Sequence, residues 1–136
     1  MDFLRSMGIA ASGLRAQAGR MRVISENIAN ADSTATAAGG DPYRRKIPTF
    51  VSELDRSLDA RVLTMGPIRR DNAEFRLKYD PTHPAADANG NVKLPNVNAL
   101  VEMTDLREAQ RSYEANLNIV TATRRMIQRT LDILRA

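Results

Sequence analysis

The sequence contains no cysteine, no tryptophan and a single histidine, His83. Without cysteine, the chain forms no disulfide, no zinc–thiolate site and no thiol nucleophile. Nucleophilic catalysis needs a base that is held by a second, orienting group, and one loop histidine does not supply this pair. We therefore expect a protein that is not an enzyme and that has no catalytic, cofactor-binding or metal-binding residues.

Long apolar runs are also missing. No stretch approaches the roughly 20 apolar residues that a membrane-spanning helix needs. The first residues, Met-Asp-Phe-Leu-Arg, do not begin a basic and then apolar signal peptide with a cleavage site. We expect no direct membrane insertion, and a protein that is either cytosolic or exported without cleavage of a signal.

Charge gives one alternative function. The formal net charge is +4, and the isoelectric point is about 10.0. A basic balance is typical of proteins that bind nucleic acid or an acidic surface. However, Glu102, Glu108 and Glu114 lie among the arginines of the last third, a mixture that suits salt bridges between helices. A basic helical protein that binds nucleic acid remains the alternative.

The last third of the chain predicts one long amphipathic helix. Apolar residues recur there in alternating steps of four and three, no proline or glycine follows Leu100, and Asn98 is a candidate N-cap. The line runs through Ala99, Met103, Leu106, Gln110, Tyr113, Leu117, Val120, Arg124, Ile127, Leu131 and Leu134.

The N-terminal segment repeats this spacing, from Phe3 to Ala31. We predict a mainly α fold, in which long N- and C-terminal helices pack as a coiled-coil-like hairpin around a small irregular β-rich insert. An ordinary two-helix hairpin inside a globular fold is the alternative. Residues 1–32 and 97–136 would form one discontinuous helical domain, and residues 33–96 the loop and insert. The predicted subunit-interface residues are Met7, Leu14, Met21, Ile24, Ile28, Met103, Leu106, Tyr113, Leu117, Val120, Ile127 and Leu131.

The insert has a weaker pattern. Residues 43–54 favour an edge strand, and residues 53–63 fit a short helix or a strand. Phe75, Leu77 and Tyr79 alternate with charged residues, which predicts a half-buried strand. Residues 89–90 favour a turn before a short returning strand. The insert alone is too small and polar for an independent core.

A small hydrolase or metal site is the remaining alternative for the insert. Asp80, His83 and Asp87 lie close together in the sequence. An EF-hand calcium loop is excluded, because Ala85 and Asn96 occupy the positions where that loop requires Asp and a bidentate Glu.

Three motifs connect the chain to a family. Ser25–Asp32 followed by Pro42–Lys46 resembles the Asn-Leu-Ala-Asn and Tyr-Lys-Arg signature near the start of bacterial flagellar rod and hook proteins. Tyr79–Gly90 followed by Leu94–Asn98 resembles a segment typical of proximal rod proteins, and Arg111–Asn116 resembles the C-terminal rod motif. The residues that carry these motifs are Asn27, Ala29, Asn30, Tyr43, Asp80, Pro81, Pro84, Asp87, Gly90, Pro95, Asn96, Asn98, Ser112, Tyr113, Ala115 and Asn116.

The resemblance to the flagellar basal-body rod family implies a structural protein needed for motility. It implies polymerisation into the periplasmic drive shaft and export channel, and type III export without a cleaved signal. The implied partners are the rod subunits FlgB, FlgF and FlgG, the adaptor FliE, copies of itself and the export apparatus. Phe50 and Leu54 resemble a short export-gate motif, although a buried strand also accounts for them. Residues 33–38 depart from the family pattern.

Overall fold

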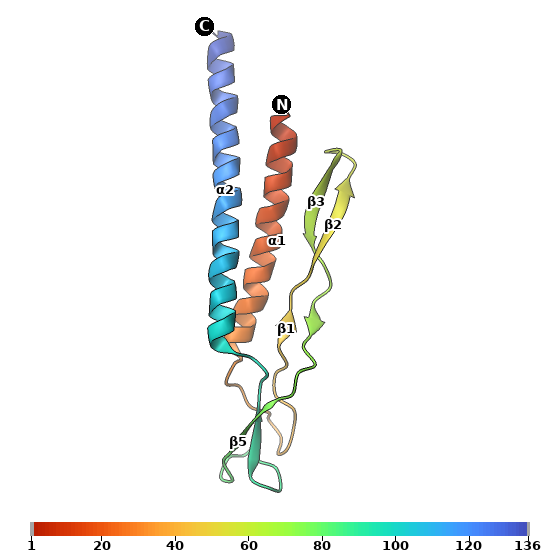
Figure 1. The fold of residues 1–136 in the computed structure, drawn as a ribbon, viewed down its shortest axis with the longest axis vertical. Helices are drawn as coiled ribbons and strands as arrows, with labels where there is room; N and C mark the ends of the chain where they lie inside the picture. Colours follow the sequence, from red (N-terminus) through yellow and green to blue (C-terminus); the bar gives the residue numbers. More distant parts are fainter. Residues whose placement is uncertain (1, 136) are drawn as a thin grey trace. The chain divides into compact units, whose positions relative to one another are not determined.

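The computed structural model describes residues 2–135, and Met1 and Ala136 at the ends of the two predicted helices lie outside them. The fold is mainly helical, with an N-terminal and a C-terminal helix and antiparallel strands between them (Figure 1). In chain order the elements are α1 (Phe3–Ala29), β1 (Lys46–Ile47), β2 (Phe50–Asp55), β3 (Ala60–Met65), β4 (Arg69–Arg70), β5 (Arg76–Tyr79), β6 (Asn91–Leu94) and α2 (Ala99–Arg135). No helix in the described residues is long and apolar enough to cross a membrane.

Side-chain caps fix the start of each helix. Asn98 Oδ1 accepts a hydrogen bond from the Leu100 amide at 3.1 Å, so the predicted N-cap of α2 is confirmed. Asp2 Oδ1 accepts one from the Arg5 amide at 3.1 Å at the start of α1. α1 ends at Ala29, a few residues before the predicted end, because Asn30 and Ser33 divert backbone carbonyls into turn hydrogen bonds.

The strands form three two-stranded antiparallel sheets, which pair β1 with β4, β2 with β3 and β5 with β6. The segment 53–63, for which helix and strand both remained open, belongs to the β2–β3 hairpin. Two expectations about burial were wrong. Leu77 and Tyr79 on β5 are exposed, and so are Phe50 and Leu54 on β2, because nothing in the described chain covers these strand surfaces.

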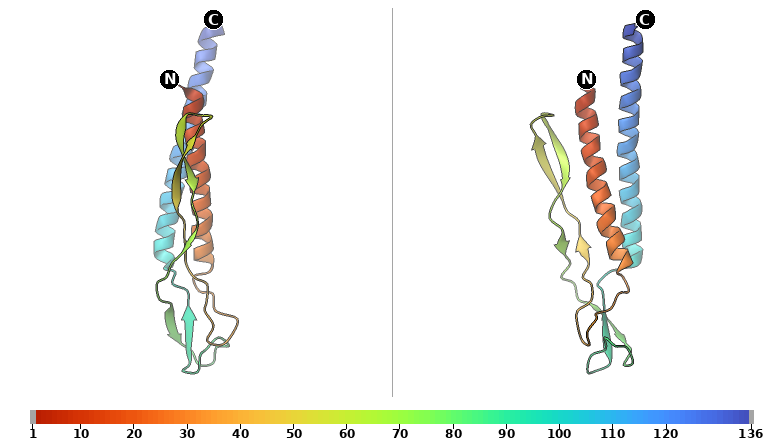
Figure 2. Two further views of the ribbon diagram at one scale, coloured as in Figure 1. Left: turned by 90° about the vertical axis from the view of Figure 1, so that its right-hand side faces the viewer. Right: turned by 180° about the vertical axis from the view of Figure 1, so that it is seen from behind.

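The chain divides into two compact units, and each contains part of both helices. Unit 1 comprises residues 1–21, 49–67 and 107–136; unit 2 comprises residues 22–48 and 68–106. Within unit 1, α1 lies between the β2–β3 hairpin and α2 (Figure 2). The apolar core of unit 2 consists of Val23, Ile24, Ala31, Ala85, Val92 and Val97.

Antiparallel helix contacts hold unit 1 together. Arg20 Nη2 lies 3.8 Å from Glu108 Oε2. Further along, a Cβ on Gly13 would lie 2.9 Å from the Asn116 amide, so α1 and α2 approach closely here and a larger residue would displace the Asn116 side chain. The two helices therefore form a hairpin, while its coiled-coil character stays a prediction.

The β2–β3 hairpin is attached to the other side of α1. The Leu63 amide donates a 3.2 Å hydrogen bond to Ser12 Oγ, and the Arg5 guanidinium donates to the Asp59 carbonyl. Leu58 and Met65 lie directly over Gly8 and Gly19, where a Cβ would collide with them. Glycines that lower the helix propensity of α1 therefore make room for the hairpin.

Candidate functional site

A buried asparagine organises the polar junction of unit 2. Asn27, at the end of α1, is fully buried. Its Oδ1 accepts hydrogen bonds from the Tyr43 hydroxyl at 2.8 Å and the Lys46 amide at 2.9 Å. Its Nδ2 donates to the Lys46 carbonyl at 2.8 Å and to Glu102 Oε2 at 3.0 Å. One amide therefore joins α1, β1 and α2 and uses its full hydrogen-bonding capacity.

A charged pair completes this junction. Glu102, in the first turn of α2, is 1% exposed, and its Oε1 accepts a hydrogen bond from Arg45 Nε. Arg45 Nη1 lies 3.4 Å from Asp71 Oδ2, and the Arg45 amide donates to Asn96 Oδ1 at 2.8 Å. A buried carboxylate needs such a partner, because an unpaired charge is costly in the interior. We call these residues the polar junction: Asn27, Tyr43, Arg45, Lys46, Asp71, Asn96 and Glu102.

The pKa shifts follow from this arrangement. Burial, and then the negative charges of Glu26 and Glu102, raise the pKa of Tyr43 to about 12. For Arg45, burial acts to lower the pKa, but hydrogen bonds and attraction from Glu102 and Asp71 outweigh it and raise the pKa. Both shifts favour the protonated forms that donate the hydrogen bonds.

The family motifs meet partly in this junction. Asn27, Tyr43 and Asn96 belong to it, and Asn98 caps α2 nearby in the sequence. Sequence reasoning missed Glu102 and Asp71, and it named Arg45 only as part of the Pro42–Lys46 motif. Nothing in the sequence signals the role of Glu102, because a carboxylate on a helix is ordinarily solvated.

The second family motif, Tyr79–Gly90, forms the turn between β5 and β6. Gly90 has a φ of +79°, which glycine adopts without strain. Asp87 Oδ1 accepts from the Asn89 and Asn91 amides, His83 Nδ1 from the Ala85 amide, and Asp80 Oδ1 from the Thr82 hydroxyl. The three candidate metal or catalytic residues are thus engaged in their own turns. Among residues 2–135 no group of three or more acidic, histidine or cysteine side chains is placed to hold a metal ion.

The predicted interface residues divide by burial. Ile24 is buried, and Met103, Leu117 and Leu131 are exposed. The other eight are half-buried: Met7, Leu14, Met21, Ile28, Leu106, Tyr113, Val120 and Ile127. Of the remaining C-terminal motif residues, Ser112 is half-buried and Ala115 is exposed, as is Ala29 on α1.

The buried line of α2 lies beside the predicted one. Glu102, Ala109 and Thr123 are buried at intervals of seven residues, and Asn116 between them is half-buried. This line is polar or small, so a pattern based on hydrophobicity selects its more apolar neighbour.

Two apolar lines of α2 are therefore exposed. The first contains the predicted Met103, Leu117 and Leu131; the second contains Ile119, Met126 and Ile133. At about 100° per residue, Leu117 and Ile119 lie on either side of the partly buried Asn116 and Val120. We call these the two exposed lines of α2. Sequence reasoning missed the second line, whose signal was its own seven-residue spacing.

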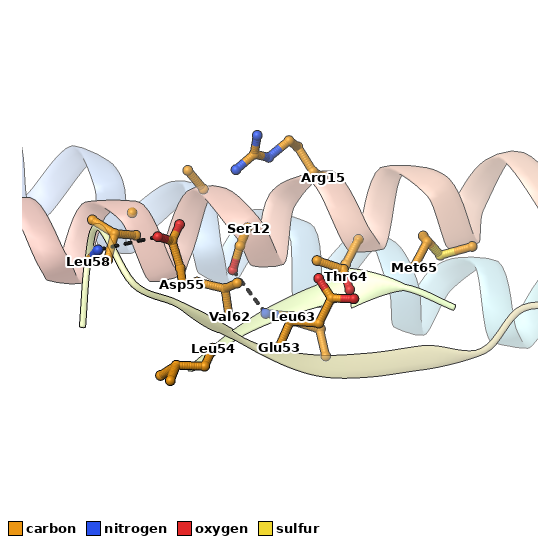
Figure 3. Close-up of a pocket in the computed structure, with 13 residues that line it drawn as sticks. Ser12, Arg15, Glu53, Leu54, Asp55, Leu58, Val62, Leu63, Thr64 and Met65 are labelled. Carbon is orange, nitrogen blue, oxygen red and sulfur yellow. Dashed lines mark hydrogen bonds between the residues drawn. The ribbon is translucent and has the colours of Figure 1, made fainter. Parts of the chain in front are cut away.

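A hollow of unit 1 lies between α1 and the β2–β3 hairpin and has a volume of about 600 Å³. Figure 3 shows the Ser12–Leu63 hydrogen bond crossing it and the Glu53 and Asp55 carboxylates on the hairpin side. Its lining combines apolar side chains with Arg15, Glu53 and Asp55 and contains no histidine. Of the charged side chains, Asp55 is held in its own turn, where its Oδ1 accepts hydrogen bonds from the Ser57 amide and hydroxyl.

Comparison with known proteins agrees with the motifs. The family model described as "Flagella basal body rod protein" matches residues 7–36, and "Flagellar basal body rod FlgEFG protein C-terminal" matches residues 88–133. These ranges cover most of α1 and nearly all of α2. The matches give no support to the nucleic-acid alternative.

Full-length relatives carry one name, flagellar basal-body rod protein FlgC. The protein from Agrobacterium fabrum is 52% identical over 94% of this chain and 92% of its own. The Bacillus subtilis protein is 39% identical over 98% and 99%, and the Salmonella typhimurium protein is 37% identical over 98% of both chains. This chain therefore belongs to the FlgC family of flagellar basal-body rod proteins.

Proposed function

We propose that this chain, a structural protein of the flagellar basal-body rod, joins neighbouring subunits through the two exposed lines of α2. The observation that carries this proposal is the exposure of large apolar side chains along the whole length of α2, including Leu117 at 45% and Ile133 at 76%. Contiguous apolar surface of this extent marks interaction sites in soluble proteins.

Two lines on one helix suit a polymer better than a dimer. A single apolar line is satisfied by one partner helix, whereas two separate lines contact two different neighbours. Contacts of this kind are heterologous, and they extend into an open assembly when the rotation does not close. Ala109 of α2 is buried, and Leu106, Tyr113, Val120 and Ile127 are half-buried, so α2 also packs within the chain while it binds neighbours.

The finer assignments rest on the family resemblance. We propose that the assembly is the proximal part of the rod, that it lies in the periplasm, and that the terminal helices line the export channel. The proposed partners are FlgB, FlgF, FlgG, the adaptor FliE, the type III export apparatus and copies of this chain.

We also propose export without cleavage of α1. The reason is that α1 is an integral part of both units: Ser12 holds the β2–β3 hairpin, and Asn27 forms the polar junction. Cleavage within or after α1 would remove these contacts. Mass spectrometry of the chain from purified basal bodies should find a mature protein that begins at Met1 or Asp2, and a longer N-terminal loss would contradict the proposal.

The central test is Leu117→Asp. Because Leu117 is already half in solvent in the single chain, the substitution should leave the helical content of the purified protein unchanged. In an assembled rod it would bury an unpaired charge, which costs several kcal/mol. Cells with this variant should make the protein, build no rod and fail to swim in soft agar.

Two controls separate charge from position. Asn118→Asp adds the same charge at the neighbouring exposed residue, which lies away from both lines, and it should preserve motility. Arg107→Ala, at another exposed position outside the lines, should cost less than about 1 kcal/mol and also preserve it. Normal swimming of Leu117→Asp cells would show that these lines are not an assembly interface.

A further inference from the structure

The outer edge of β2 is free in the single chain. The Leu63 amide of β3 points away from β2 and donates to Ser12, so Leu63 and its partner on β2 form a non-hydrogen-bonded pair. The hydrogen bonds between β2 and β3 are therefore made by the residue pairs on either side of this one. The register pairs Ser52 with Leu63, which places the backbone groups of Phe50, Ser52 and Leu54 on the outer edge. In residues 2–135 no contact outside the hairpin satisfies these groups, and β2 exposes apolar side chains beside them.

The outer edge of β5 likewise has no backbone hydrogen-bond partner within residues 2–135. The Asp80 amide bonds to the Gly90 carbonyl at 2.9 Å, and the strands continue in register, with Tyr79 opposite Asn91. Alternation then turns the backbone groups of Leu77 and Tyr79 outward. Both side chains are strongly exposed, at 65% and 73%. Natural proteins usually blunt such edges, because an open apolar edge pairs with another strand.

The two edges are complementary in charge. β2 carries Glu53 and Asp55 and no basic residue, whereas β5 carries Arg76 and Lys78 and no acidic one. Glu53 and Lys78 have no ion-pair partner in the described part of the chain. Pairing of β2 with a second β2 would bring like charges together, which destabilises a sheet.

We propose that β2 of one copy pairs with β5 of a second copy as an antiparallel two-strand junction between subunits. In the register that sets Leu54 opposite Leu77, Glu53 faces Lys78 and Asp55 faces Arg76. In this register the outward backbone groups of the two strands hydrogen-bond to each other, the two leucines form an apolar pair, and opposite charges face each other. The contact joins two different surfaces, so it is heterologous, and it extends an open assembly when the rotation between copies does not close.

This inference rests on the proposed function, because it concerns copies assembled in the rod. It is tested by disulfide trapping, for which the absence of native cysteine gives a clean background. Glu53→Cys and Lys78→Cys chains with different epitope tags are co-expressed, and basal bodies from motile cells are oxidised. The proposed register puts the two Cα atoms about 4.5 Å apart, within disulfide reach. A linked pair that carries both tags is expected, and the link is intermolecular by design.

The matched control replaces Lys78→Cys with Leu77→Cys, whose side chain points to the other face of the strand. It should give little or no linked pair with Glu53→Cys. Equal linking of the control, or a link from Glu53→Cys to a different rod protein, would overturn the proposal.

Charge reversal gives a second, independent test of the strand pairing. Glu53→Lys or Lys78→Glu alone sets like charges opposite each other and should lower the number of assembled basal bodies severalfold. The double variant should restore it. If the single variants assemble normally, or the double variant restores nothing, the strand pairing is wrong. Basal bodies that contain the chain but show no specific link overturn the pairing and leave the proposed function intact, whereas rods built without the chain would overturn both.

Discussion

Asn27 acts on β1 as a short strand would. Its amide binds both the N–H and the C=O of Lys46, which are the two groups that a neighbouring strand would bind. The same side chain holds Tyr43 and Glu102, so its two oxygen lone pairs and two N–H groups are all used. No other side chain of this size offers two donors and an acceptor in this geometry, which explains the need for asparagine here.

Asn27→Asp is therefore expected to destabilise the protein although the side chains are isosteric. The new oxygen would face the Lys46 carbonyl and the Glu102 carboxylate, both of which are acceptors. An unsatisfied buried group and a repelled charge should cost about 3 kcal/mol, measured by urea unfolding. The same change at exposed Asn89 should cost less than about 0.5 kcal/mol. Equal unfolding midpoints for the two variants would show that the amide contributes little.

Tyr43 predicts a loss of stability at alkaline pH. Its pKa is raised to about 12 in the folded protein, against 10.0 ordinarily, because burial and nearby carboxylates disfavour the phenolate. A raised folded-state pKa contributes stability that is complete below pH about 10 and is lost as the pH rises toward about 12. The phenol must also stay protonated to donate to Asn27 Oδ1.

Tyr43→Phe should flatten this part of the stability–pH profile and remove the phenolate absorbance component with a midpoint near pH 12. Tyr79→Phe, at an exposed position outside the junction, should leave that component in place. Persistence of the component in Tyr43→Phe would assign it to another tyrosine.

Motif reasoning reached about half of this junction for a physical reason. Asn27, Tyr43 and Asn96 lie in short segments whose residue order resembles a known family. Glu102 and Asp71 lie outside such segments, and their roles depend on which elements meet in space. A carboxylate on a helix is ordinarily solvated, so one sequence gives no reason to bury it.

At the scale of elements, spacing predicted the helices but not their orientation. Both helices followed from the apolar repeat and the Asn98 cap, while their coiled-coil-like hairpin packing stays a prediction. The rotation of α2 did not follow, because the chain buries the line through Ala109 and Thr123 and exposes Leu117. Close approach to α1 at Gly13 favours small or polar neighbours over large apolar ones. The apolar repeat therefore does not mark the buried face of α2 within the chain, and we propose that its exposed residues contact other subunits.

The glycine at the helix crossing gives the test at this scale. Gly13→Val would place side-chain carbon against the Asn116 amide, where even a Cβ has only 2.9 Å. Overpacking of this kind should cost about 1–3 kcal/mol in thermal or urea unfolding.

Asn116→Ala should recover part of this loss by making room for the valine. The double variant should thus be more stable than the sum of the single effects predicts, a coupling that double-mutant cycles measure directly. Strict additivity would indicate that α1 and α2 do not meet at these residues.

At the scale of the whole molecule, the surface is divided between two tasks. Polar contacts within each unit specify the fold, while much of the large apolar surface is left exposed on α2, β2 and β5. A chain that keeps its apolar surface for neighbours gains stability from assembly rather than from its own core.

The stability of the purified chain should consequently depend on its concentration. Association buries the two exposed lines of α2, so the associated form is favoured by mass action, and the apparent melting temperature should rise over a roughly 100-fold increase in concentration. Leu117→Asp disfavours association without touching the fold, and its melting temperature should stay constant over the same range. Asn118→Asp, with the same added charge away from the lines, should retain the dependence of the original chain. A melting temperature of the unmodified chain that is independent of concentration would show that the exposed lines of α2 do not bind a second copy of the chain.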